Sequence, residues 1–322
     1  MMKKLFKNNF RELSVIIAIL AMALIFGVLN PAYLRPVNLI DILDQATIYG
    51  LMGVGIMLPI ITGGIDISVG SALAFAGCVV AQLAVAGVNP VLCMLVGLIV
   101  GFLAGLLNGF LISKMKLQPF IATMGTQSVY RGVAYIITNG YPVLGVPDSY
   151  RDMLNFKIIG DIRISIVIFL VWAVIVYILL RKTRLGTYIY AIGGNMEAAR
   201  LSGVRVELIQ MMAYAIGMLG TALAGVIQVA KLGTGDPTTG NGWEMNAIAA
   251  AAIGGTSMAG GRGNPWGTVL GAILFSGLKV GLVVMNVNTY WQYVATGLVI
   301  VVAAYVEIFQ SMVTSRKKKK KA

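Results

Sequence analysis

The chain is dominated by apolar segments long enough to cross a lipid bilayer. Hydropathy separates about ten such segments, joined by short polar connections. A bilayer supplies no hydrogen-bonding partner to the backbone, so a chain of this kind pairs its backbone N–H groups inside its own helices. Hydrophobic residues make up 58% of the chain and charged residues 11%, which leaves too little polar surface for a soluble domain. The sequence predicts an all-α integral membrane protein.

The apolar segments predict a single transmembrane domain over residues 1–322. The first segment follows positive charges, as a signal peptide does, but Asn30 and Pro31 stand where a cleavage site would need small residues, so we count it as a retained span. The domain has three parts, which are a membrane bundle at 12–310, a polar loop at 181–207 and a polybasic tail at 311–322. The predicted spans are 13–29, 45–61, 71–87, 91–112, 120–139, 164–180, 208–229, 245–253, 266–284 and 291–309.

Positive charge is distributed unevenly between the two sides of these spans. With the N-terminus inside, 18 Lys and Arg residues fall on the inner side and 5 on the outer side. Cytoplasmic loops carry the excess of Lys and Arg, so both termini and the loop 181–207 are placed in the cytoplasm. Membrane orientation therefore accounts for the net charge of +13, and we predict no nucleic-acid binding. Connections 36–44, 140–163 and 233–243 are placed outside.

The residue types present exclude several kinds of chemistry. Histidine is absent, and the two cysteines lie in apolar runs without metal-ligand spacing. We predict no catalytic residue and no metal site. The ionisable residues within the spans are few and form no evident proton relay; they are Asp66, Arg131, Glu244, Lys279 and Glu307.

The cytoplasmic loop contains the pattern of a short capped helix. Asn195 is placed to accept a hydrogen bond from the first turn of a helix at 196–202, and Gly203 can adopt the left-handed conformation that ends it. Glu197 near the start and Arg200 near the end complement the helix dipole. These residues fit an ordered connector and an exposed docking helix equally well.

The sequence GGIDISVGS, which begins at Gly63, is unusual for a membrane segment. Gly63 and Gly64 can break a helix, and Asp66 can cap the next one by accepting from the N–H of Ser68 or Val69. An acidic group so near hydrocarbon is costly unless its lone pairs are satisfied. Broken backbone at membrane depth is tolerated where it lines a cavity, so a capping role and a pathway role both stay open here.

The span 120–139 carries a polar face that lipid would not tolerate, and this face includes Gln127 and Arg131. A lone guanidinium near mid-span faces the bundle interior, where it pairs with a carboxylate or with carbonyl groups. Gln127 and Arg131 are candidates for the pathway, and for Arg131 the alternatives are a structural partner and contact with a substrate. The outer connection 140–163 fits either a docking surface for a soluble partner or a plain connector.

A second glycine-rich break follows the span 245–253. Gly254, Gly255 and Gly261 repeat the spacing of the earlier break at a constant offset, a short echo that is typical of internal repeats in transporters. These glycines are not a Walker phosphate loop, because no Gly-Lys-Ser or Gly-Lys-Thr follows them. We take Gly254 and Gly255 as candidate helix-break residues of the pathway, and we expect nucleotide to bind on another chain.

Several motifs resemble one family of transport proteins. Glu197, Ala198 and Ala199, followed by Gly203, resemble the EAA-x-x-x-G signature of the permease subunits of ABC importers. Together, the motifs are similar to those of the monosaccharide permeases typified by the ribose importer, over nearly all of the chain after Gly63. The motifs are GGIDISVGS (63–71), PFIATMGTQSVYRG (119–132), YAIGGNMEAARLSGV (190–204) and IGGTSMAGGRG (253–263).

The resemblance implies a permease subunit of the bacterial cytoplasmic (inner) membrane that holds no cofactor itself. ATP and Mg²⁺ would bind a separate ABC ATPase, and closure of the ATPase would move the docked helices and switch the side on which the pathway is open. A second permease copy would complete the pathway, a periplasmic or lipid-anchored sugar-binding protein would deliver the substrate, and membrane lipid is the remaining partner. The residues implied to contact the ATPase are Asn195, Glu197, Ala198, Ala199, Arg200 and Gly203.

Two other functional classes are weaker. An ion-coupled secondary transporter is the main alternative, but it has no use for a docking helix and needs an ion site that the embedded ionisable residues do not suggest. A membrane enzyme would need a nucleophile motif or paired carboxylates, and the chain offers neither. Ribose or a related monosaccharide is the expected substrate, although permeases for other sugars and for furanosyl signalling molecules look alike at these motifs.

Overall fold

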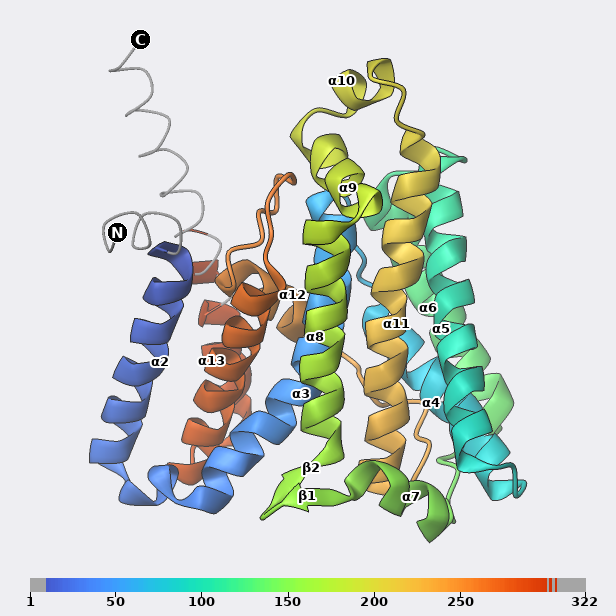
Figure 1. Cartoon of the computed structure of the whole chain (residues 1–322). Coiled ribbons are helices and arrows are strands. Elements are labelled where there is room, and N and C mark those ends of the chain that lie inside the picture. The colour runs from blue at the N-terminus through green and yellow to red at the C-terminus, as the bar shows by residue number, and fades with distance from the viewer. Residues whose placement is uncertain (1–9, 300, 303–304, 306–322) are drawn as a thin grey trace.

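Long helices run side by side between two polar faces of the molecule (Figure 1). A computed structural model describes residues 10–299, 301–302 and 305. Prolines at the first turn begin several of these helices, because a missing N–H leaves no donor unsatisfied there. The helices of the bundle are α2 (Phe10–Leu29), α3 (Pro36–Ile61), α4 (Val69–Val85), α5 (Pro90–Ser113), α6 (Pro119–Thr138), α8 (Ile164–Lys182), α11 (Val206–Leu232), α12 (Trp243–Ile253) and α13 (Pro265–Val284), and a further helix covers 289–299.

Shorter elements lie on the two faces. One face, called the α10 face below, carries α9 (Arg184–Gly194) and α10 (Met196–Leu201). The opposite face carries η1 (Pro31–Leu34), α7 (Asp148–Asn155) and a hairpin of two antiparallel strands, β1 (Lys157–Ile159) and β2 (Ile162–Arg163). The hairpin is the one departure from the all-α prediction within the described residues, and it lies outside the apolar band.

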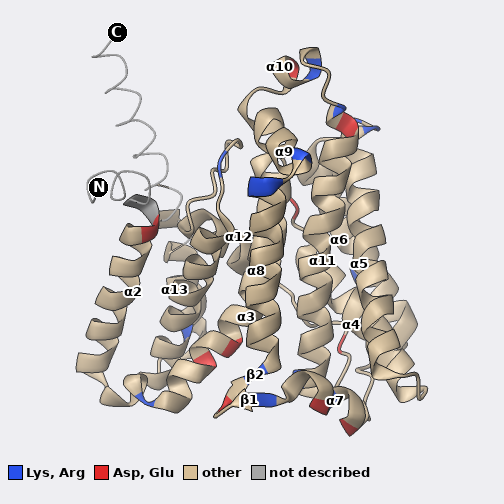
Figure 2. Ribbon diagram, viewed as in Figure 1, with Lys and Arg blue, Asp and Glu red and all other residues tan. Residues whose placement is uncertain are grey.

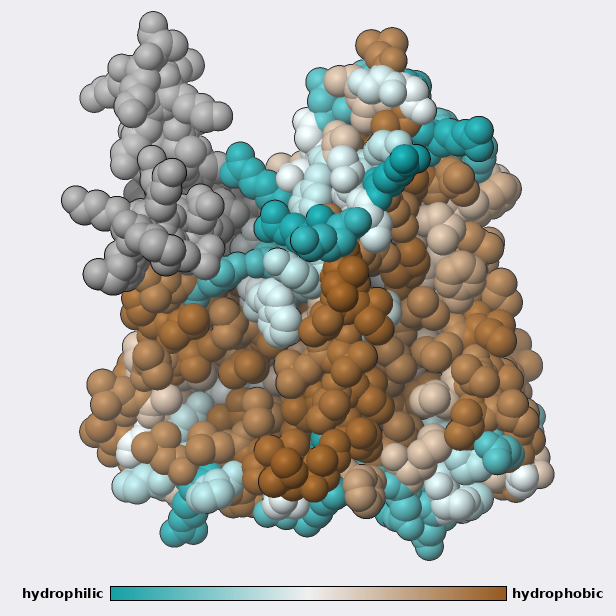
Figure 3. All heavy atoms as spheres, viewed as in Figure 1, coloured by the Kyte–Doolittle hydropathy of each residue, from teal (hydrophilic) through white to brown (hydrophobic). Residues whose placement is uncertain are grey.

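The all-α membrane class is confirmed. On the face shown in Figure 3, an apolar band crosses the middle of the molecule, and polar residues lie above and below it. Six of the described helices are long and apolar enough to cross a membrane: Glu12–Leu29, Pro36–Ile61, Pro90–Ser113, Ile164–Lys182, Val206–Leu232 and Pro265–Val284. The helices α4 and α12 are shorter, with 17 and 11 residues. The tail 311–322 and Glu307 lie outside the described residues.

The segment 36–44, predicted as an outer connection, is instead the first part of α3. A buried acid explains the difference, because Asp44 is only 4% exposed. Its carboxylate pairs with Arg163 of β2 and, at 3.7 Å, with Lys231 of α11. The sequence alone places the charge of Asp44 at the membrane surface, but the two basic partners neutralise it inside the bundle. The helix α3 can therefore include Asp44.

The connection 233–243, predicted to lie outside, instead enters the bundle. A Cβ built on Gly70, in the first turn of α4, would lie 2.3 Å from the carbonyl oxygen of Gly240, so the two backbones touch there. Residues 233–242 therefore lead from the outer end of α11 to the start of α12 beside α4 (Figure 1). Residues 62–68 lead from the end of α3 on the α10 face to the start of α4. We call these two non-helical segments the interruptions.

The charges agree with the predicted sides. Lys and Arg gather around α9 and α10, on the face from which α2 starts, while acidic and basic residues mix near α7 and the hairpin (Figure 2). There, Lys157 donates to Asp161 at 2.6 Å, and this hydrogen bond lowers the pKa of that carboxyl group. The α10 face thus carries the cytoplasmic charge signature.

Glycines allow the closest helix contacts in the core. Where α3 meets α11, a Cβ on Gly55 would lie 2.2 Å from the Gly217 carbonyl oxygen, and a Cβ on Gly217 would lie 2.6 Å from the Gly55 carbonyl oxygen. Where α5 meets α11, a Cβ on Gly105 would lie 2.4 Å from the Tyr214 carbonyl oxygen. Small residues let helix backbones approach in lipid, and α11 uses them against two neighbours.

This packing predicts opposite effects for one substitution at two glycines. Gly55→Ala should destabilise the protein by about 1–3 kcal/mol, because the new methyl group overlaps the α11 backbone. Gly125→Ala is the matched control on α6, since nothing lies within 4 Å of its Cβ position, and it should leave stability unchanged or raise it by up to about 1 kcal/mol. Thermal unfolding in detergent measures both, and equal melting temperatures would contradict the close contact.

Candidate functional site

The predicted capped helix is present as α10, Met196–Leu201, one residue shorter than expected. The Asn195 side chain accepts from the Ala198 N–H at 3.0 Å, and Gly203 follows with a left-handed φ of 83°. Ala199 is buried against the rest of the loop. The sequence did not predict α9, whose own N-cap is Thr183, accepting from the Gly186 N–H at 3.2 Å. Asn195 is therefore the C-cap of α9 and the N-cap of α10 at once.

The outer surface of α10 is exposed and carries both charge and an apolar group. The Glu197 side chain is 73% exposed, and Leu201 is 88% exposed. Arg200 pairs with Glu197 and with Glu207, each at 3.1 Å, and Lys116 reaches the same Glu207 oxygen at 3.1 Å. Exposed ion pairs of this kind contribute about 0–1 kcal/mol each, so α10 protrudes without being strongly held by them.

A buried polar cluster surrounds Asp66, which is 2% exposed. Its Oδ1 accepts from the backbone N–H of Ser68 at 2.9 Å and from the Ser68 hydroxyl at 2.6 Å, so the predicted bond is present, and it holds Ser68, the N-cap residue of α4. The Asn108 amide donates to Asp66 Oδ2 at 3.0 Å and to the Ser68 hydroxyl at 2.8 Å. The Tyr130 hydroxyl donates to Asn108 Oδ1 at 2.9 Å. Two helices, α5 through Asn108 and α6 through Tyr130, thus converge on the first interruption.

Asn108 and Tyr130 are the partners that the sequence reasoning missed. Asn108 stands in an otherwise apolar span, and an unexplained amide in such a span was the available signal. Tyr130 lies on the predicted polar face of α6, but its position gives no indication of which group it contacts. The structure therefore adds a support around Asp66 that favours the capping role, and it leaves the pathway role of Gly63, Gly64, Asp66 and Ser68 a prediction.

A second polar group lies at the other interruption. Arg131, half-buried, donates from Nη1 to the carbonyl oxygen of Pro237 and, at 2.8 Å, to that of Thr239. Of the partners expected for this guanidinium, the carbonyl groups are therefore the ones observed. Gln127 approaches Glu244 Oε1 at 3.5 Å, and the other oxygen of Glu244 is buried without a hydrogen-bond partner among the described residues. Gln127 and Arg131 of α6 thus face the start of α12.

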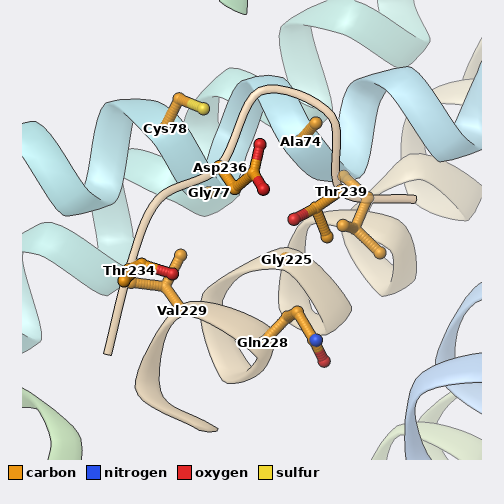
Figure 4. A pocket seen from close by; sticks show the side chains of 10 residues that line it. Ala74, Gly77, Cys78, Gly225, Gln228, Val229, Thr234, Asp236 and Thr239 are labelled. Carbon is orange, nitrogen blue, oxygen red and sulfur yellow. The ribbon is translucent and has the colours of Figure 1, made fainter. Parts of the chain in front are cut away.

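The second interruption covers a small cavity between α4 and α11 (Figure 4). Its lining includes Cys78 and Gly77 of α4, Gln228 of α11, and Asp236 and Thr239 of the interruption. The volume is about 10 Å³, room for about one water molecule and far too little for a sugar. The cavity marks a place where the interruption packs loosely on α4, and we assign it no ligand.

The glycine pairs end two helices on the α10 face. Gly63, with φ +85°, follows α3, and Gly255, with φ +86°, follows α12, so the echo noted in the sequence has matching backbone geometry. Their neighbours are tightly packed, because a Cβ on Gly64 would lie 2.2 Å from the Tyr214 hydroxyl and one on Gly254 would lie 2.4 Å from the Gly267 backbone. These glycines therefore lie toward the α10 face of the bundle.

Comparison with known proteins gives one family for most of the chain. The family described as "Branched-chain amino acid transport system / permease component" matches residues 38–304. The ribose import permease protein of Bacillus subtilis is 38% identical over 307 residues, covering 94% of both chains. The D-allose transport system permease protein of Escherichia coli is 37% identical over 298 residues, covering 92% of this chain and 89% of the relative.

A third relative has a different printed substrate. The autoinducer 2 import system permease protein of Photorhabdus luminescens is 33% identical over 305 residues, covering 93% of this chain and 90% of the relative. No solved structure matches the chain. The similarity therefore rests on sequence across nearly the full length of each relative.

The cluster around Asp66 predicts a larger loss of stability than a simple cap. Asp66→Ala leaves the Ser68 N–H, the Ser68 hydroxyl and the Asn108 amide without their acceptor, at a cost of about 1–3 kcal/mol. Asp236→Ala is the matched control, because Asp236 Oδ1 accepts from the N–H and hydroxyl of Thr238 in the same way where water can replace it. Thermal unfolding compares the two, and an Asp66→Ala protein of normal stability that no longer transports would favour the pathway role.

The contacts of Arg131 predict that it fixes the second interruption. Arg131→Ala removes both hydrogen bonds to the carbonyl groups of Pro237 and Thr239, so amide hydrogen exchange over 236–243 should become faster. Ser128→Ala is the control on the same helix, since the exposed Ser128 hydroxyl donates only to its own helix at Met124. Unchanged exchange in the Arg131 variant would show that other contacts hold the segment.

Proposed function

The chain belongs to the family of branched-chain amino acid transport system permease components, and from that premise we propose that it is the translocation subunit of an ATP-driven importer for a monosaccharide. Ribose is the first substrate to test, because the ribose permease of Bacillus subtilis covers 94% of the chain at 38% identity. That identity, spread over the full bundle, is the single observation that carries the proposal. The protein is a multi-pass protein of the bacterial cytoplasmic membrane.

ATP is hydrolysed on a separate chain in this proposal, and α10 is the docking helix for that ATPase. The supporting features are the exposed Glu197 and Leu201, which offer a charge and an apolar contact on one short helix, and the Asn195 cap that fixes its start. The basic residues around α9 and α10 support a cytoplasmic position for this face, where ATP is available. The ATPase, with its ATP and Mg²⁺, is therefore the proposed cytoplasmic partner.

We place the pathway along α6 and α12, where a second copy of the chain would complete it. One face of α6 is open, since nothing lies within 4 Å of a Cβ built on Gly125 or Gly132. On another side of α6, toward the second interruption and α12, lie the polar groups of Gln127, Arg131 and Glu244, which a lipid-facing surface would not carry. A sugar needs both donors and acceptors, and these side chains supply both. A soluble sugar-binding protein would deliver the sugar at the opposite face, near α7 and the hairpin.

The proposed topology has ten crossings with both termini in the cytoplasm. The six apolar helices account for part of it, and α4, α6, α12 and the helix at 289–299 supply the rest. In this arrangement α4, with 17 residues, and α12, with 11, are short helices that complete their crossings with the two interruptions. Successive helices then alternate in direction, and the start of α2 lies on the α10 face (Figure 1).

The docking role of α10 predicts the effect of a charge reversal. Glu197→Lys should abolish ATP-driven ribose uptake and binding of the cognate ATPase while the protein stays folded, because the exposed pair with Arg200 contributes only about 0–1 kcal/mol. Asp148→Lys makes the same charge change at an 83%-exposed carboxylate of the opposite face and should keep ATPase binding. Uptake is measured in proteoliposomes that contain the permease and ATPase, with the sugar-binding protein and ribose outside.

Two outcomes of that experiment would contradict the proposal. Normal uptake by the Glu197→Lys protein would remove the docking role of α10. Ribose accumulation by the wild-type chain without ATPase or ATP would identify an ion-coupled carrier instead.

A further inference from the structure

Three glycine-containing segments that are far apart in the sequence meet on the α10 face. Gly193 lies in the last turn of α9, Ile61 is the last residue of α3, and Gly261 lies between α12 and α13. The Gly261 N–H donates to the Ile61 carbonyl oxygen at 2.8 Å. A Cβ built on Gly193 would lie 1.7 Å from that same oxygen and 2.4 Å from the Gly261 nitrogen. The three backbones touch without any side chain between them, and we call this contact the glycine junction.

The junction excludes every side chain at position 193. A Cβ at 1.7 Å from a carbonyl oxygen overlaps it completely, and the neighbouring atoms are backbone, which moves only with its whole segment. The next residue differs, because nothing lies within 4 Å of a Cβ built on Gly194. The pair Gly193-Gly194 therefore contains one glycine that the contact requires and one that it does not.

On one side, the junction is connected directly to α10. Asn195 ends α9 with its backbone N–H bonded to the Ala191 carbonyl oxygen at 3.0 Å, and its side chain caps α10. Because the two helices share this residue, a displacement of α10 moves the end of α9, where Gly193 lies.

On the other side, the junction is connected to both helix breaks. Ile61 immediately precedes the first interruption, which leads to the Asp66 cluster, and Gly261 belongs to the connection that follows α12, the helix entered from the second interruption. Tyr190, one turn before Gly193, strengthens the contact by donating to the Gly263 carbonyl oxygen at 2.7 Å. Burial raises the pKa of the Tyr190 hydroxyl, so it stays a donor at neutral pH.

We propose that Gly193 is the positioning residue through which movement of α10 reaches the two broken helices, by direct backbone contact with Ile61 and Gly261. This inference rests on the proposed function, since it assumes that an ATPase moves α10. Close-packed backbone transmits a displacement that flexible side chains would absorb. The motifs YAIGGN and GGTSMAGGRG thereby contribute one glycine each, Gly193 and Gly261, to a single contact with the end of α3.

The test compares Gly193→Ala with Gly194→Ala in proteoliposomes that contain the cognate ATPase, with the sugar-binding protein and ribose outside. Gly193→Ala should keep ATPase binding and ATP hydrolysis but lower the ribose imported per ATP by about tenfold or more, within the usual range of coupling between sites. Gly194→Ala should match the wild type. Equal ratios in the two variants would overturn the proposal, whereas absence of ATP-driven ribose import by the wild type would contradict the proposed function instead.

Two further measurements separate coupling from folding. Amide hydrogen exchange on the permease alone should show faster exchange of the Gly261 N–H in Gly193→Ala and unchanged exchange in Gly194→Ala; equal protection would show that the contact is not closed in solution. If Gly193→Ala does not fold, the Tyr190→Phe protein is tested in its place, because this substitution removes only the hydrogen bond to Gly263. It should lower the ribose imported per ATP with normal ATPase binding, and an unchanged ratio would overturn the proposal.

Discussion

Non-helical backbone inside a membrane has to find its hydrogen bonds within the protein, and the two interruptions impose this requirement on the whole fold. Neighbouring residues of α6 meet it. The Tyr130 hydroxyl supports Asn108, which in turn holds Asp66 at the first interruption, and Arg131 holds the carbonyl groups of Pro237 and Thr239 at the second. One helix therefore stabilises both breaks from adjacent positions. This explains why α6 is less apolar than its neighbours although it lies within the membrane.

The sequence predicted local features well, because their causes are local. The caps at Asn195 and Asp66 depend on a side chain two or three residues before the N–H that it accepts from, and both bonds are present. The prediction that residues 233–243 lie outside was wrong, because the position of this segment depends on distant residues. A turn-rich sequence with an aspartate is expected equally for a surface loop and for a loop inside the bundle. The position of this segment depends on the contact between Gly70 and Gly240, which are far apart in the sequence. The same holds for Asp44, whose partners come from β2 and α11.

The α10 face combines an exposed surface that few strong contacts hold with a close backbone contact. The charged side chains of α10 are exposed, and their ion pairs are of the kind that contributes little to stability, so a partner can engage them at small cost. Behind α10, the Gly193 backbone lies against Ile61 and Gly261 with no room for a methyl group. An exposed helix that a partner can bind, with close-packed backbone behind it, is suited to passing a displacement to the rest of the bundle. A plain connector would need neither property.

The chemistry of Arg131 would link the pathway proposed along α6 to the second interruption. A guanidinium has five N–H donors in a planar fork, and the two bonds to Pro237 and Thr239 both come from Nη1. Neither of these bonds uses Nη2 or Nε. A sugar hydroxyl that accepted a hydrogen bond from one of these N–H groups would contact the same residue that fixes 233–242. A ligand shifts a conformational equilibrium only by its differential affinity for the two states. Arg131 holds the second interruption in the observed state, so a sugar bonded to Arg131 would have different affinities for the two states.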